Sequence, residues 1–219
     1  MRSLAEPAVL LRAALAAALT VLACYPRLAN WGQRPDALWY LMAVVGWAAF
    51  VMWAAVFAWS ERHGGVKLFR RDVSVQVWLS ALGLGVAGGA VMFFLVDPTL
   101  REVSPTDFPR TTSEWFERML FNLALEQLFL CLAPFAFCAR LFRTQRAGAI
   151  GVVLFSLLVF ALKLQSVNAH LSGTLVALLA VFRTFSSVVM VGLLLRGGFW
   201  PLMLFSFVLQ CRHWFTFGG

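Results

Sequence analysis

Long apolar runs without charged residues are the feature that most constrains this chain. Residues 37–59 and 73–96 contain no Asp, Glu, Lys or Arg, and each run is long enough to cross a bilayer as a helix. Five further runs have at most one interruption each, at 8–24, 119–139, 147–162, 171–195 and 199–211. Backbone polar groups cannot face lipid unpaired, and these runs lack the alternation of barrel strands. The sequence therefore predicts an all-α, polytopic membrane helix bundle of about seven transmembrane helices, with six or eight as alternatives.

Composition excludes several other classes of protein. Hydrophobic residues make up 61% of the chain and charged residues only 13%, whereas soluble domains average about half apolar and a quarter charged. The formal net charge of +8 comes mostly from residues between the apolar runs. This distribution is typical of membrane topology, so a water-soluble enzyme and a nucleic-acid partner are both excluded.

The loops indicate an orientation. The loop after the second run carries Arg62, Lys67, Arg70 and Arg71, and cytoplasmic loops are enriched in Lys and Arg. We therefore expect a cytoplasmic N-terminus, in a bacterial inner membrane. The segment 97–118 contains five acidic residues and three prolines, and we expect it to form an external or interfacial loop.

Ionisable residues within the runs are candidates for function, because a charge at mid-bilayer costs several kcal/mol. Glu126 is central to its run, and Arg183 and Lys163 are the available cations. Glu126 could act as a base on water or form a structural ion pair with either cation. Arg183 also leaves open whether 171–195 is one helix or two. His170 follows Lys163 near a predicted helix end, where an interfacial position is the simpler interpretation.

Metal and cofactor sites are not indicated. The three histidines are scattered along the chain, and the four cysteines include no CxxC pair. A metal site needs at least three ligands close together, so we expect neither a metal nor a cofactor.

The second half of the chain resembles the CPBP family of intramembrane proteases, the CAAX-protease and bacteriocin-processing family. The resemblance covers about 116–210, and the stretch VGLLLRGGFWP at 191–201 is its most specific part. The family motif EExxxR matches Glu126, with Gln127 and Cys131 at its other positions. The motif FxxxH retains only its Phe at residue 160, and HxxxN is replaced by Ser206 and Gln210.

The resemblance implies one membrane domain, 1–219, with a CPBP-like core from the fourth to the last helix at 116–219. Residues 1–115 would then be peripheral helices and the acidic loop. The family is thought to activate water with Glu and His and to stabilise an oxyanion with His and Asn. Glu126 remains as the candidate base, while Gln127, Ser206 and Gln210 occupy degenerate positions. Lys163, Arg183 and His170 would be structural polar residues.

Three functions follow from these patterns. The first is a non-catalytic subunit or scaffold that binds another membrane protein or a membrane-anchored peptide within the bilayer. The second is a divergent glutamic-type peptidase that uses Glu126 to activate water. The third is an unrelated transporter subunit with a polar path along Glu126, Lys163 and Arg183.

Overall fold

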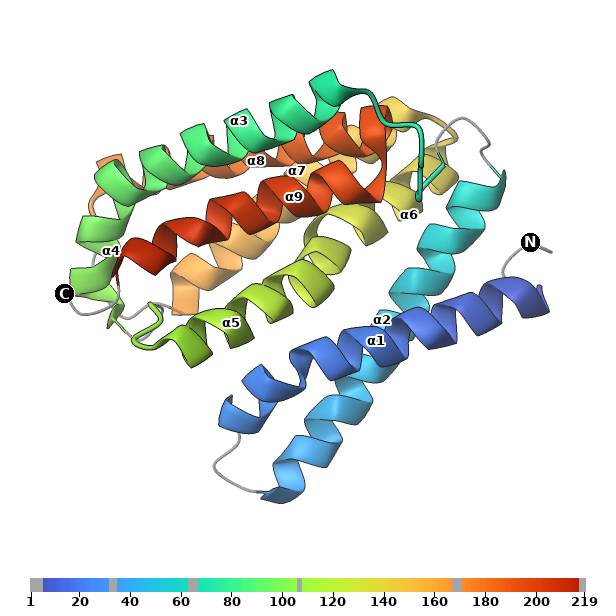
Figure 1. Cartoon of the computed structure of the whole chain (residues 1–219), viewed down its shortest axis with the longest axis horizontal. Helices are drawn as coiled ribbons and strands as arrows, with labels where there is room; N and C mark the ends of the chain where they lie inside the picture. The colour runs from blue at the N-terminus through green and yellow to red at the C-terminus, as the bar shows by residue number, and fades with distance from the viewer. Residues whose placement is uncertain (1–5, 32–34, 63–66, 106–107, 167–170, 217–219) are drawn as a thin grey trace. The chain divides into compact units, whose positions relative to one another are not determined.

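The computed structural model describes residues 6–31, 35–62, 67–105, 108–166 and 171–216, and these residues form helices joined by short irregular segments, with no strand among them (Figure 1). Six helical stretches in these ranges are long and apolar enough to cross a membrane. They begin with Pro7–Asn30, Ala37–Glu61 and Val75–Val103 and continue with Thr112–Phe142, Gln145–Gln165 and Gly173–Gly197. The prediction of an all-α membrane bundle is confirmed.

Contacts divide the chain into two compact units. Unit 1 contains 1–67 and 116–148, and unit 2 contains 68–115 and 149–219. Each unit therefore combines residues from both halves of the sequence. The predicted division into peripheral helices at 1–115 and a core at 116–219 stays a prediction.

Unit 1 is built on a helical hairpin. Helices α1 (Pro7–Trp31) and α2 (Pro35–Arg62) pack along each other, and Trp53 of α2 donates a 3.0 Å hydrogen bond to the Thr20 hydroxyl of α1. Helix α2 also packs against α6 (Ala133–Phe142), where the rings of Trp59 and Phe135 meet edge to face at 5.1 Å. Two π-helical segments, η4 (Asn122–Glu126) and η5 (Leu128–Leu132), precede α6.

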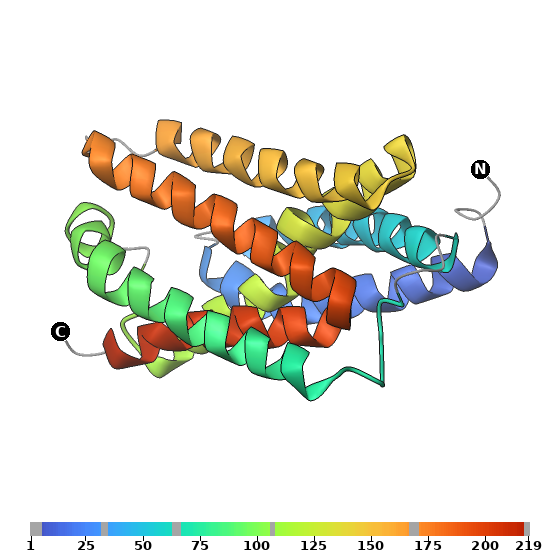
Figure 2. The same ribbon diagram turned by 90° about the horizontal axis from the view of Figure 1, so that it is seen from above.

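Unit 2 is organised by a close approach of α3 (Val75–Val91) to α9 (Phe199–Gln210), which lie side by side in Figures 1 and 2. A Cβ at Gly85 would lie 2.9 Å from the Val208 side chain, so glycine permits this approach. Helix α8 (Gly173–Gly197) packs against both helices. The remaining elements are π-helical η2 (Met92–Val96), α4 (Asp97–Val103) and the 3₁₀ turn η6 (Cys211–Thr216).

Two helices contain residues of both units. Helix α5 (Thr112–Phe121) begins in the residues of unit 2 and ends in those of unit 1. Helix α7 (Gln145–Ser166) begins in unit 1 and continues in unit 2.

The structure settles one expectation and corrects another. Helix α8 is continuous through Arg183, so the predicted run at 171–195 forms one helix and not two. The segment 97–118, expected to be a loop, is largely helical, because α4 continues from η2 and α5 begins at Thr112. Pro98 lies inside this continuous helix, directly after the π-helical turn η2, where the regular hydrogen-bond pattern is already interrupted. The final run forms a helix of only 12 residues, α9, which is shorter than a spanning helix needs.

Candidate functional site

The predicted base, Glu126, lies where the helix geometry is unusual. It is the last residue of η4, and Gln127 separates η4 from η5. A π turn carries one extra residue per turn, so side chains five positions apart become neighbours. Such turns are rare and occur frequently at functional sites.

Two side-chain amides from the same helical stretch are linked to the Glu126 carboxylate, one directly and one through the other. The side-chain amide of Asn122 donates a hydrogen bond to the Glu126 carboxylate. The Gln127 amide donates to the Asn122 carbonyl oxygen at 3.4 Å, so Asn122 links the two motif positions. Gln127 is buried, and its own side-chain oxygen has no partner among the described residues.

Helix α1 packs against this segment of unit 1. It contacts η4, and Cys24 of α1 is buried. Glu126 is half-buried, and its carboxylate accepts a hydrogen bond from a neutral amide. This arrangement can position a carboxylate or bind a polar partner group.

The other predicted site residues belong to unit 2. Lys163 lies in the last turn of α7 and Arg183 in the middle of α8. Ser206 and Gln210 lie one turn apart on α9, as the motif spacing predicted. Ser206 is buried, and its hydroxyl has no hydrogen-bond partner among the described residues. His170 falls outside the described residues.

The groups present limit the chemistry of the predicted site. In the part of the chain that the structure describes, His213 in η6 is the only histidine. The same ranges contain no group of three His, Cys, Asp or Glu side chains placed to hold a metal ion. Hydrolysis of an amide needs a base and donors aimed at the oxyanion, and a single amide-bound carboxylate supplies only the first.

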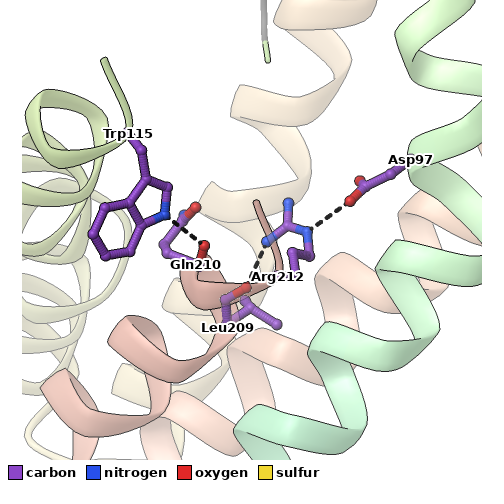
Figure 3. Close-up of polar contacts among 5 residues, drawn as sticks. All are labelled: Asp97, Trp115, Leu209, Gln210 and Arg212. Atoms are coloured by element: carbon purple, nitrogen blue, oxygen red, sulfur yellow. Dashed lines mark hydrogen bonds and ion pairs between the residues drawn. The ribbon is translucent and has the colours of Figure 1, made fainter. Parts of the chain in front are cut away.

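A second polar site in unit 2 was not predicted from the sequence. Asp97, the first residue of α4, accepts a 3.1 Å hydrogen bond from Nε of Arg212 in η6 (Figure 3). The Asp97 side chain is 1% exposed and that of Arg212 is 12% exposed. Arg212 also donates to the backbone carbonyl of Leu209 at 2.8 Å, which satisfies one carbonyl at the end of α9.

The indole of Trp115 binds the same end of α9. Trp115 donates from Nε1 to the backbone carbonyl of Gln210 at 3.0 Å (Figure 3). Burial lowers the pKa of Arg212 from its ordinary value, and the charge and hydrogen bond of Asp97 oppose that shift. The bonds from Trp115 and Arg212 satisfy two carbonyls at the C-terminus of α9, and the ion pair of Arg212 with Asp97 joins η6 to α4.

The sequence carries a signal for this pair. Asp97 directly follows one apolar run and Arg212 directly follows another, so both lie at the ends of predicted helices. Opposite charges at the ends of two runs are compatible with pairing if the two helices pack together. The packing of α3 against α9 supplies that condition.

Comparisons with known proteins add no family to this description. No protein-family profile, curated protein or solved structure matches the chain.

Proposed function

We propose that the chain is a non-catalytic membrane protein with a CPBP-like arrangement of its second half, which binds another membrane protein or a membrane-anchored peptide. One observation carries the proposal. The Glu126 carboxylate is bound by the Asn122 amide of its own helix, and Asn122 is in turn linked to the buried amide of Gln127.

This network favours binding over hydrolysis for a chemical reason. Two neighbouring carboxylates can share a proton and deliver it during water attack, whereas an amide neither accepts nor releases a proton near neutral pH. Gln127 therefore supports the position of Glu126 without supplying a second titrating group. The buried Ser206 hydroxyl, which has no hydrogen-bond partner within the described ranges, is likewise a hydrogen-bonding group and not a base.

A census of cleaved termini of membrane proteins tests the proposal. Cells would carry the intact chain, Glu126→Gln, Glu102→Gln as the control at an exposed acid, or a gene deletion. We expect the same termini in all four, together with a deletion phenotype that Glu126→Gln rescues. Termini that disappear in both Glu126→Gln and the deletion, but persist with Glu102→Gln, would show a working peptidase.

The partner can be sought in the same strains. Cross-linking in the membrane, followed by purification of the full chain, should recover a defined membrane protein or anchored peptide. We expect Glu126→Gln to preserve this complex or to alter only its assembly. Loss of function with the fold and the complex both intact would contradict a binding role.

A divergent peptidase is the second candidate, and the π-helical segments favour it. Glu126 ends one such segment and a second begins two residues later, and π turns occur frequently at functional sites. A peptide whose cleavage requires Glu126 would establish this alternative.

A further inference from the structure

The turn between α8 and α9 forms one corner of unit 2 with the segment that precedes α3 (Figure 1). Gly198 joins the two helices with a φ of 76°, and the amide of Phe199 donates a 2.7 Å hydrogen bond to the carbonyl of Leu68. Arg70 donates to the carbonyl of Arg196 at 2.9 Å. These contacts bring residues far apart in sequence to one place.

Positive charge gathers at this corner. The Arg70 side chain reaches the backbone carbonyl of Arg196, and Arg71 is the next residue in the chain, so all three arginines belong to this corner. Arg71 and Arg196 are exposed, and neither forms an ion pair with any described residue. Asp72 is the only acidic residue in the segment 68–74. The corner therefore has an excess of positive charge.

The corner lies at the end of two membrane spans. The span Gly173–Gly197 ends here and the span Val75–Val103 begins here. Their ends are close together, because a Cβ at Gly197 would lie 2.8 Å from the Val77 side chain and 3.2 Å from that of Val73. The arginines thus lie at the depth where a spanning helix meets the lipid headgroups.

Aromatic side chains flank the arginines. Phe69 contacts the rings of Phe199 and Trp200 at centroid distances of 5.3 and 6.1 Å. Phe69 is 49% exposed and Trp200 is 50% exposed. Aromatic residues are enriched at the boundary between acyl chains and headgroups, where one part of the ring remains apolar.

We propose that Arg70, Arg71 and Arg196 bind the phosphate of an anionic phospholipid headgroup, with Phe69 and Trp200 against its upper acyl chains. Guanidinium groups suit phosphate because their planar N–H donors bind two oxygens together. Lysines and arginines at a membrane surface are attracted to anionic lipids. The proposal is independent of whether the chain is a scaffold or a peptidase.

Native mass spectrometry of the delipidated full chain in an uncharged detergent tests this site. The probe is an equal mixture of phosphatidylglycerol and phosphatidylcholine. We expect preferential retention of phosphatidylglycerol, reduced about fivefold for each arginine removed in Arg71→Gln/Arg196→Gln. Arg110→Gln/Arg146→Gln removes the same charge at exposed positions elsewhere and should retain the preference.

A charge-preserving variant controls for misfolding of the glutamine variant. Arg71→Lys/Arg196→Lys should keep most of the preference, with circular dichroism confirming an unchanged helical fold. Equal retention of both lipids by the intact chain would overturn the proposal. An equal loss of the phosphatidylglycerol preference in Arg110→Gln/Arg146→Gln would also overturn it. Displacement of phosphatidylglycerol by inorganic phosphate at equal concentration would show a phosphate site and would also overturn it.

Discussion

Replacing Asp97 with asparagine should leave the Arg212 guanidinium without its counter-ion in a buried site. The two side chains are 1% and 12% exposed, so water compensates little for the lost partner. Removing one member of a buried ion pair typically destabilises a protein by 3–5 kcal/mol. Because Arg212 keeps its 2.8 Å bond to the Leu209 carbonyl, we expect about 3 kcal/mol, the lower end of that range.

A double-mutant cycle isolates the pair. Asp97→Leu and Arg212→Met each leave one buried charge, whereas the double variant leaves none and replaces polar groups by apolar groups of similar size. We expect the double variant to be about as stable as the intact chain, apart from roughly 1 kcal/mol for the lost bond to the Leu209 carbonyl. The interaction energy should therefore exceed about 2 kcal/mol.

Reversible unfolding in mixed micelles, followed by far-UV circular dichroism against increasing SDS, measures these free energies. Arg110→Gln is the matched control, because this exposed arginine should change the free energy of unfolding by less than about 0.5 kcal/mol. Simple additivity of the two single variants would refute the reasoning, since it would mean that neither charge depends on the other.

The same assay checks two other positions. Gly85→Ala should destabilise the fold by about 1–3 kcal/mol, because the added Cβ would lie 2.9 Å from Val208. Gly83→Ala is the control and should be neutral, because a Cβ there meets nothing within 4 Å. Equal changes in the free energy of unfolding for the two variants would contradict close packing of α3 against α9. Trp53→Phe removes the buried hydrogen bond to the Thr20 hydroxyl and should lower the free energy of unfolding by about 1–3 kcal/mol. An unchanged midpoint of the SDS unfolding curve would argue against that bond. Burial raises the pKa of Cys211 above its usual 9.0, so maleimide should label it more slowly at neutral pH than an exposed thiol, with a rate that still rises above pH 9. Labelling as fast as a free thiol would contradict that shift.

Part of the candidate site was predictable from the spacing along single helices. Asn122 and Glu126 are four residues apart, so any helical geometry brings them to one face. Ser206 and Gln210 share a face of α9 for the same reason. The contact from Gln127 to Asn122 spans five residues and depends on the π turn, which no residue pattern here predicts.

Residue type by itself determined the fold class and the main spans. An uncharged run of about 20 apolar residues has few folded solutions other than a membrane helix, because lipid cannot satisfy an open backbone. The helical ranges at 37–61 and 173–197 follow the apolar runs closely. These properties are local, so the sequence is sufficient for them.

Only the tertiary structure decided which distant polar groups meet. Asp97 and Arg212 are 115 residues apart, and no local pattern in the sequence pairs them. Their pairing exists because Gly85 lets α3 approach α9, which brings the end of one apolar run beside the end of another. The corner of Arg70 and Arg196 likewise depends on the turn at Gly198. Such contacts are set by how helices pack, and helix packing depends on side-chain shapes from several segments at once.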